Sequence, residues 1–490
     1  MPNAAASRAV AALIAGLSIA SSGYAEPATA YASASSQVYR VELSADWSRL
    51  TVEACFFEDL PKRLHAGSDE AYKYLEAPGI RHGAQTLAPP QGALSVALES
   101  ESQTACLQYS VAVRAAADAS RREGGTQSGD TLVVSPGLWL WRPAQLPDDA
   151  LLQFELPQGV NVSAPWPILQ RRGNVTQFRL TNTPPSWPAR MAIGRFPTHE
   201  IAVGGATLHL AILDASPPAD DAAVTAWLDE AARAVTTLYG RFPLSQAQLL
   251  LTPIGRQPEP VPWGQVLRGG RPAAHLFFDQ TRPSREWRND WTAVHELAHM
   301  LLPYISRRDA WLSEGFATYY QNVLRARAGL ISETDAWRKL VAGFGRGQRG
   351  TRRGISLDDA SRAMRRERTF MRVYWSGAAI ALLADTQLRQ SDAGMSLDEA
   401  LSRLARCCLP SPRMWTARQA FERMDELTGN DMFVALAEQY RGSDQFPDVD
   451  DLLLRLGVIG RGDTLSLDDD AELAPLRRAL MRTPPEPPAH

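Results

Sequence analysis

In the first half of the chain, apolar residues come in short runs separated by proline, glycine and serine. Between Gln37 and about Pro197 the runs are Val38–Leu43, Leu50–Phe57, Leu94–Leu98, Ala105–Val113, Thr131–Val134, Leu151–Leu156 and Thr176–Leu180. Short strands with turn residues between them are typical of an antiparallel sandwich. We therefore predict a β-sandwich domain over residues 37–203, with a polar loop at Arg121–Asp130.

Near Ala206 the pattern changes, and strand-like runs begin to alternate with helical periodicity. Apolar residues at i, i+4, i+8 and i+11 predict a helix from about Asp220 to Tyr239. Strands are expected at Thr207–Leu213, Ala247–Leu251 and Ala273–Phe278. From Arg288 onward the spacing is mostly helical, apart from a Gly/Arg-rich stretch at Gly345–Gly354 that is typical of a solvated loop.

Together these patterns predict an α+β protein with two domains, which suits a chain of 490 residues. A mainly helical domain with a small sheet, residues 204–445, is expected to follow the β-sandwich. Residues 446–490 then form a C-terminal segment that ends in a Pro-rich tail, and this composition is typical of disorder.

The N-terminal end has the pattern of an export signal. A short positive region precedes the uncharged apolar stretch Ala9–Ala20, and Gly23 and Ala25 stand where a cleavage site has small residues. The stretch is short for a membrane span, and no later stretch reaches the ~18 apolar residues that a transmembrane helix needs. We therefore expect a signal peptide at 1–25, a flexible mature N-terminus at 26–36, and an exported chain that is periplasmic or secreted. A buried N-terminal helix is the alternative.

Composition narrows the classes of function. The chain has 51 Lys and Arg residues against 54 Asp and Glu, a formal net charge of −3, which argues against a strongly basic nucleic-acid binder. In an exported chain, Cys55 and Cys106 could form a disulfide. Cys407 and Cys408 are adjacent, and two buried free thiols are the simpler expectation. None of the four cysteines has CxxC spacing, so a zinc site built from cysteine is not expected.

The segment Asp290–Leu302, DWTAVHELAHMLL, contains the motif HExxH. Residues four apart lie on the same face of a helix, so His295 and His299 can reach one metal ion. Glu296 stands next to the first histidine and can contact a metal-bound water without binding the metal. The alternative is two histidines on a half-buried helix face, satisfied by backbone or water.

A second helical segment, Trp311–Tyr320, offers a third ligand. Glu314 lies among apolar and aromatic residues there, where an unpaired carboxylate would be costly, and a metal held by His295 and His299 would relieve that cost. Two histidines, one glutamate and an open position are the ligands of a catalytic zinc. Gly315 leaves room for the close approach of a neighbouring helix. The alternative for Glu314 is a surface carboxylate or a salt-bridge partner.

These segments resemble the zinc peptidases of the thermolysin-like fold, namely the glycyl aminopeptidase family and the related aminopeptidase N and leukotriene hydrolase family. The shared features are HExxH at His295–His299 and a W-L-x-E-G-F-A/T-x-Y helix at Trp311–Tyr320. Leu238–Pro243 is similar to the Y/F-G-x-F/Y-P turn of these families, and Tyr374–Ala378 to their Y-x-K/R-G segment. The resemblance implies a thermolysin-like catalytic domain, one Zn²⁺ ion, and a Tyr374 hydroxyl that hydrogen-bonds the tetrahedral intermediate. A core aromatic with its hydroxyl on a backbone carbonyl is the alternative.

The chain departs from these families where they bind the amino group of the substrate. In the aminopeptidases a G-x-M-E-N-like element precedes HExxH, and its carboxylate holds the free α-amino group. The corresponding segment is expected at Gly269–Ala273, which has no acidic residue. Gly269 and Gly270 could let a strand edge approach the substrate backbone, although a plain turn is the alternative. Ser376 also stands where Lys or Arg is usual.

The sequence therefore predicts a zinc metallopeptidase of the HExxH…E type that acts on a peptide or protein. In this hypothesis His295, His299 and Glu314 hold one zinc ion, and Glu296 is the general base for a metal-activated water. Tyr374 stabilises the oxyanion. By resemblance the activity is aminopeptidase-like. An endopeptidase that lacks the amino-terminal anchor and a catalytically silent binding scaffold stay open, and the sequence does not predict the oligomeric state.

Overall fold

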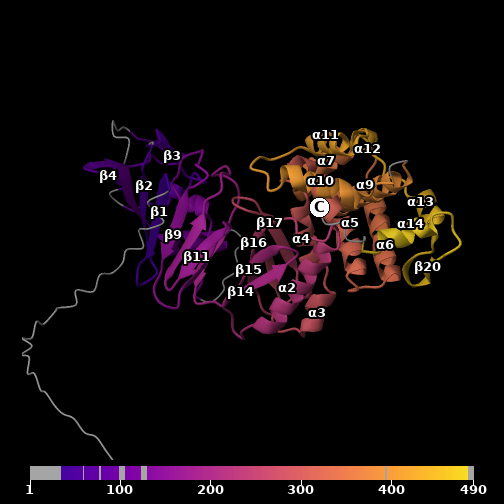
Figure 1. The fold of residues 1–490 in the computed structure, drawn as a ribbon, viewed down its shortest axis with the longest axis horizontal. Coiled ribbons are helices and arrows are strands. Elements are labelled where there is room, and N and C mark those ends of the chain that lie inside the picture. The colour runs from indigo at the N-terminus through magenta and orange to yellow at the C-terminus, as the bar shows by residue number, and fades with distance from the viewer. Residues whose placement is uncertain are drawn as a thin grey trace, which may run out of the picture.

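The computed structural model describes residues 35–483 except 59, 77–78, 99–104, 123–129 and 392–393. The predicted signal peptide, nearly all of the predicted mature N-terminus, most of the predicted loop at 121–130 and the tail at 484–490 lie outside the described residues. Figure 1 shows a β-rich part in indigo and magenta beside a helical part in orange and yellow. No helix of the described residues is both long and apolar enough to cross a bilayer.

The N-terminal domain is built around an eight-stranded sheet with the order β11-β12-β9-β1-β2-β7-β4-β5, and two smaller sheets have the orders β10-β13-β8 and β3-β6. The strands are β1 (Gln37–Leu43), β2 (Leu50–Phe56), β3 (Arg63–His65), β4 (Ile80–His82), β5 (Gln85–Leu87), β6 (Ser95–Ala97), β7 (Ala105–Val111), β8 (Leu132–Val134), β9 (Leu151–Glu155), β10 (Asn161–Ser163), β11 (Ile168–Arg172), β12 (Val175–Arg179) and β13 (Met191–Gly194). Trp139, Trp141 and Phe154 are fully buried in its core. The predicted β-domain is therefore present, but β1 and β9 pair in parallel. A helix, α1 (Val113–Arg122), follows β7.

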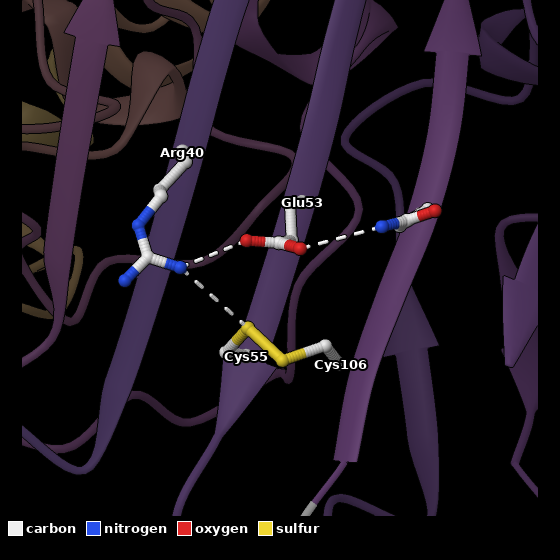
Figure 2. Close-up of a disulfide and its surroundings, with 5 residues drawn as sticks. Arg40, Glu53, Cys55 and Cys106 are labelled. Carbon is white, nitrogen blue, oxygen red and sulfur yellow. Dashed lines mark hydrogen bonds and ion pairs between the residues drawn. A yellow bond between two sulfur atoms is a disulfide. The ribbon is translucent and has the colours of Figure 1, made fainter. Parts of the chain in front are cut away.

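A disulfide links neighbouring strands of the large sheet. Cys55 on β2 lies directly opposite Cys106 on β7, and their sulfurs are bonded (Figure 2). Beside it, the Arg40 guanidinium pairs with the Glu53 carboxylate at 2.8 Å, and Gln108 Nε2 donates to the other oxygen of Glu53 at 3.3 Å. The pairing that the sequence left open is thus present.

Cys407 and Cys408 are also joined in a disulfide. The expectation of two buried free thiols was wrong, because the pair lies at the end of α10 (Leu397–Cys408), where the helix leaves the core and Cys407 is exposed.

The second domain begins with a five-stranded sheet of order β14-β15-β16-β18-β17. Its strands are β14 (Thr198–Val203), β15 (Ala206–Ile212), β16 (Gln246–Pro253), β17 (Trp263–Leu267) and β18 (Ala273–Phe278). The predicted boundary at residue 204 was therefore placed too late. Gly204 and Gly205, both with positive φ, form a two-residue turn that pairs β14 with β15, so the sheet starts at Thr198. Strand β17 is the antiparallel edge of an otherwise mostly parallel sheet.

Helices cover one face of this sheet and extend beyond it (Figure 1). They are α2 (Asp221–Thr236), α3 (Ser284–Asn289), α4 (Thr292–Ala298), α5 (Ala310–Arg327), α6 (Glu333–Gly350), α7 (Leu357–Arg362), α8 (Met364–Glu367), α9 (Phe370–Gln390), α10, α11 (Ala417–Thr428), α12 (Met432–Arg441), α13 (Asp450–Arg455) and α14 (Ala474–Leu480), with a small hairpin of β19 (Val458–Ile459) and β20 (Ser466–Leu467). The other face of the sheet packs on the N-terminal domain, where Leu250 joins a core cluster with Ala192 and Phe196. The predicted α+β fold class is confirmed.

The Gly/Arg-rich stretch is not the loop that its composition predicts, because α6 continues to Gly350. Gly343 and Gly347 of this helix face the side chains of Trp375 and Phe446 so closely that a Cβ at either glycine would overlap them. The glycines that weaken the helix locally therefore let α6 pack tightly against α9.

Buried polar contacts join α5 to helices α9 and α10. The Tyr319 hydroxyl donates to Asp385 of α9 at 2.9 Å, and the Tyr320 hydroxyl donates to Asp398 of α10 at 2.9 Å. Arg327 pairs with the same Asp398 at 2.9 Å, so the buried charge of this carboxylate has a partner of opposite sign. These contacts fix the helix that carries the predicted third metal ligand.

Candidate metal centre and active site

The predicted site forms where α4, α5 and α9 meet. Helices α5 and α9 touch through their backbones, since a Cβ on Gly315 would overlap Gly377 and one on Gly377 would overlap the carbonyl of Trp311. Glu314 stands next to this crossing on α5, and Tyr374 stands one turn before it on α9. The close approach that Gly315 suggested is thus an approach to Gly377.

The structure brings the three predicted metal ligands together. Nε2 of His295 and Nε2 of His299 each lie 3.4 Å from Oε2 of Glu314, and the three ligand atoms all lie within 4.8 Å of one another. The Glu314 side chain is only 21% exposed and faces both imidazoles, unlike a surface carboxylate. Two imidazoles and a carboxylate around a common point are a donor set that fits one zinc ion.

Two contacts that the sequence analysis missed hold the histidines in place. Nδ1 of His295 donates to Oε1 of Gln321 at 2.7 Å, which leaves Nε2 free to face Glu314. Gln321 is seven residues after Glu314 on α5, and this spacing on one helix face was the available signal. At the end of α4, Arg268 donates to the backbone carbonyls of His299 at 2.7 Å and of Leu302 at 3.3 Å.

The two buried carboxylates of the site have pKa values that are shifted in opposite directions. Burial raises the pKa of Glu296, and the nearby His299 and His295 only partly oppose this. Burial also acts to raise the pKa of Glu314, but the two histidines outweigh it and hold the pKa well below its usual range. For His295, burial acts to lower the pKa, whereas the hydrogen bond to Glu314 and the charges of Glu296 and Glu314 raise it overall. Glu314 is thus suited to bind a cation, and Glu296 to accept a proton.

Edge strand β17 runs beside the predicted base. A Cβ on Gly264 would lie 2.5 Å from Cγ and 2.8 Å from Oε1 of Glu296, so only glycine leaves room for this carboxylate. This strand was not predicted from the sequence, and the glycines expected to bind substrate were predicted to lie after it. A glycine between Trp263 and Gln265, ahead of HExxH, was the signal that could have identified it.

Gly269 and Gly270 do not reach the site. The amide of Gly269 donates to the carbonyl of Pro188 at 2.8 Å, and a Cβ on Gly270 would overlap the carbonyl of Pro165. Both glycines therefore let the turn after β17 pack on the N-terminal domain, and the expectation that they bind substrate is corrected.

Tyr374 faces the candidate metal ligands. Its ring stacks on His295 with centroids 6.1 Å apart and an interplanar angle of 13°. Its hydroxyl lies within reach of the Glu314 carboxylate, and burial together with the charge of Glu314 raises its pKa. The hydroxyl therefore keeps its proton and can donate it in a hydrogen bond.

The site opens into a cleft of about 530 Å³. Its walls include Trp263 and Gly264 of β17, Trp291 before α4, and Tyr374. Among the described residues that line the cleft, Glu296 and Glu314 are the only carboxylates.

Comparisons with known proteins agree with the motifs. The family model described as M61 glycyl aminopeptidase matches residues 303–380, which include Glu314 and Tyr374. No sequence among the curated proteins matches the chain. An aminopeptidase N family protein from Idiomarina loihiensis superposes with a TM-score of 0.56 at 15% identity, over 88% of this chain and 77% of that chain.

Two further solved structures share the fold. The M1 zinc metallopeptidase from Deinococcus radiodurans has a TM-score of 0.50 at 15% identity, over 84% of this chain and 94% of that chain. Leukotriene A4 hydrolase from Saccharomyces cerevisiae has a TM-score of 0.52 at 12% identity, over 84% of this chain and 68% of that chain. The resemblance is therefore confirmed: residues 303–380 match the glycyl aminopeptidase family, and the fold is similar to that of the aminopeptidase N family and its M1 relatives.

Proposed function

We propose that the protein is a zinc metallopeptidase that hydrolyses peptide bonds. The single observation that carries this proposal is the convergence of His295, His299 and Glu314, with the buried carboxylate of Glu296 beside them. The match to a peptidase family over residues 303–380 supports it. When bound, zinc would supply a Lewis acid that polarises the scissile carbonyl and lowers the pKa of water.

The side chains of this chain then divide the work of proton transfer and charge stabilisation. Glu296 takes the proton of the attacking water and holds it at its carboxylate until the leaving amine accepts it. The raised pKa of Glu296 favours this role, because a base must be able to keep the proton. The Tyr374 hydroxyl donates a hydrogen bond to the oxyanion, an effect worth ~3–4 kcal/mol for a well-placed donor.

Endopeptidase activity is the second candidate function. In the aminopeptidases that the chain resembles, an additional carboxylate holds the free amino group of the substrate. The described residues that line the cleft offer only Glu296 and Glu314, and both are needed for the reaction. We therefore expect peptides with a blocked amino terminus to be accepted.

The test combines metal analysis with a peptide assay on the mature chain, using free and N-blocked peptides and a chelator. We expect one zinc per chain and hydrolysis that the chelator abolishes and zinc restores. Glu296→Gln should lower kcat by about 10²–10⁴-fold with zinc still near stoichiometric. Retained activity would eliminate Glu296 as the base, and zinc binding without cleavage of any peptide would favour a silent scaffold.

We also propose that the protein works outside the cytoplasm, in the periplasm or beyond the cell. The disulfides Cys55–Cys106 and Cys407–Cys408 support this, because disulfides persist in oxidising compartments. Cell fractionation with alkylation of free thiols tests it. Recovery of the protein only in the cytosol, with its thiols free, would contradict the proposal.

A further inference from the structure

The charges along the wall of the cleft indicate which peptides the site accepts. The cleft is lined by five arginines, namely Arg268, Arg307, Arg362, Arg365 and Arg366. A cleft with an excess of one charge attracts ligands of the opposite charge and raises their local concentration. The only carboxylates on the described part of its wall are Glu296 and Glu314, and the reaction uses both.

Three of these arginines already have partners. Arg268 donates to backbone carbonyls at the end of α4. Arg362 pairs with Asp359 at 2.9 Å, and Arg366 pairs with the neighbouring Glu367 at 2.9 Å. These three guanidiniums thus already make contacts within the protein.

Arg307 and Arg365 differ from these three arginines in having no such partner among the described residues. Both are exposed, and neither has a side-chain ion pair or hydrogen bond to any residue that the structure describes. Arg365 lies close enough to Tyr374 for its charge to act on the hydroxyl, so this guanidinium is near the reacting part of the cleft. Arg307 precedes α5, so the two cations reach the cleft from separate segments.

The remaining wall favours a peptide that lies flat across the site. Trp263 and Trp291 are 46% and 42% exposed, and both line the cleft. Large aromatic surfaces of this kind bind extended chains without regard to charge. Any preference between charged and neutral peptides must therefore come from the guanidiniums of Arg307 and Arg365.

We propose that the site selects peptides with a carboxylate near the scissile bond, and that Arg365 and Arg307 bind this carboxylate. The guanidinium fork matches a carboxylate in a bidentate manner, whereas an α-ammonium group would meet like charge. This inference rests on the proposed function. The carboxylate comes either from an Asp or Glu side chain or from the free C-terminus of a short peptide, because both present the same group.

The kinetic test uses matched pairs of N-blocked peptides. In one pair Glu next to the scissile bond is replaced by Gln, and in the other the C-terminal acid is replaced by the amide. We expect kcat/KM to be about tenfold higher for the carboxylate member of at least one pair, as one charge-assisted hydrogen bond would give. The pair that shows the preference identifies the source of the carboxylate, and raised ionic strength should reduce the preference.

Variants assign the preference to residues. Arg365→Gln and Arg307→Gln should each reduce the ratio of kcat/KM between the two members of the pair severalfold. Arg308→Gln is the matched control, because Arg308 is adjacent and exposed but lines a different hollow. A ratio that is unchanged in both cleft variants, or that falls equally in the control, would overturn the assignment.

Binding separates this inference from the proposed function. Fluorescence anisotropy of the labelled acidic peptide and its Gln counterpart, on zinc-loaded Glu296→Gln protein, should show tighter binding of the acidic peptide that Arg365→Gln abolishes. Equal hydrolysis of both peptides by an active enzyme overturns the inference alone. Selective binding with no hydrolysis by the native chain overturns the proposed function alone. If the protein shows no selective binding and no hydrolysis, both the inference and the proposed function are overturned.

Discussion

At the scale of single residues, the chemistry of the site was more predictable than its substrate contacts. The convergence of His295, His299 and Glu314 could be predicted, because HExxH puts both imidazoles on one helix face and Glu314 stands among apolar residues where an unpaired carboxylate is costly. Gln321 and Arg268 could not, because a side chain that orients a ligand has no required residue type. The same holds for Gly264, whose role depends on where strand β17 lies in space.

Tyr374→Phe tests the oxyanion donor. Removing the hydroxyl should lower kcat by about 10²–10³-fold, because a donor aimed at developing charge is lost. Bound zinc should stay the same, since the phenol is not one of the three proposed ligands. Tyr440→Phe on α12 makes the same change away from the cleft and should leave kcat unaltered. Normal turnover in Tyr374→Phe would return this residue to a packing role.

Gly264→Ala tests the contact between β17 and the base. The added methyl would meet Glu296 at 2.5 Å, so the carboxylate must shift. We expect kcat to fall by at least about tenfold with zinc content unchanged, because displacement of a catalytic group by about 1 Å costs up to 10²-fold. Gly442→Ala is the control, since nothing lies within 4 Å of its added Cβ. If Gly264→Ala turns over like the control, the strand does not position Glu296.

At the scale of elements, the sequence predicted the long periodic helices and failed where tertiary packing overrides local preference. Helix α2 was expected from Asp220 to Tyr239 and spans Asp221–Thr236. Helix α6 was expected to end before the stretch Gly345–Gly354, but it continues to Gly350, and Gly347 of that stretch is a contact point for Trp375 and Phe446. Strand β17, short and set among prolines, lacks a clear alternating pattern and was missed.

Gly377→Ala tests the crossing of α5 and α9. Its Cβ would overlap the carbonyl of Trp311, and backbone cannot yield as a flexible side chain can. The helices must separate, so we expect a fall in the free energy of unfolding of about 1–3 kcal/mol, the usual cost of overpacking. Zinc affinity should fall with it, because Glu314 is carried by α5. Urea unfolding and zinc titration, with Gly442→Ala as control, measure both effects, and native values for both would show that the crossing tolerates a methyl group.

At the scale of the whole molecule, the order of the two domains was predicted, but the joint between them was not. The boundary was set by a change of pattern, whereas β14 belongs to the second sheet through its hairpin with β15. Contacts across the joint involve residues that no local pattern marks. His275 on β18 is one of them: its ring is fully buried, and Arg190 of the N-terminal domain is near enough to act on its charge.

His275 should make the joint sensitive to acid. Burial, and to a lesser degree Arg190, lowers the pKa of His275 to about 3 from a usual value of 6.5. Between these two values the unfolded chain binds a proton that the folded chain does not, so stability falls as the pH falls, by about 1.4 kcal/mol per pH unit. Between pH 6.5 and pH 5, the free energy of unfolding of His275→Leu should therefore fall by about 2 kcal/mol less than that of the native chain, as measured by urea unfolding. The half-buried His82 supplies the control, His82→Leu. Equal acid sensitivity of the native chain and His275→Leu would contradict this account.

The turn that joins β17 to β18 is anchored from the other domain, because the amides of Gly269 and Arg271 donate to the carbonyls of Pro188 and Pro165 at 2.8 and 2.7 Å. The β-domain thus holds one end of strand β17, which lies beside Glu296. A helical half produced by itself would keep its histidines and Glu314 yet leave that strand untethered at one end. Such a fragment should retain zinc while losing turnover, because the strand beside Glu296 would no longer be anchored.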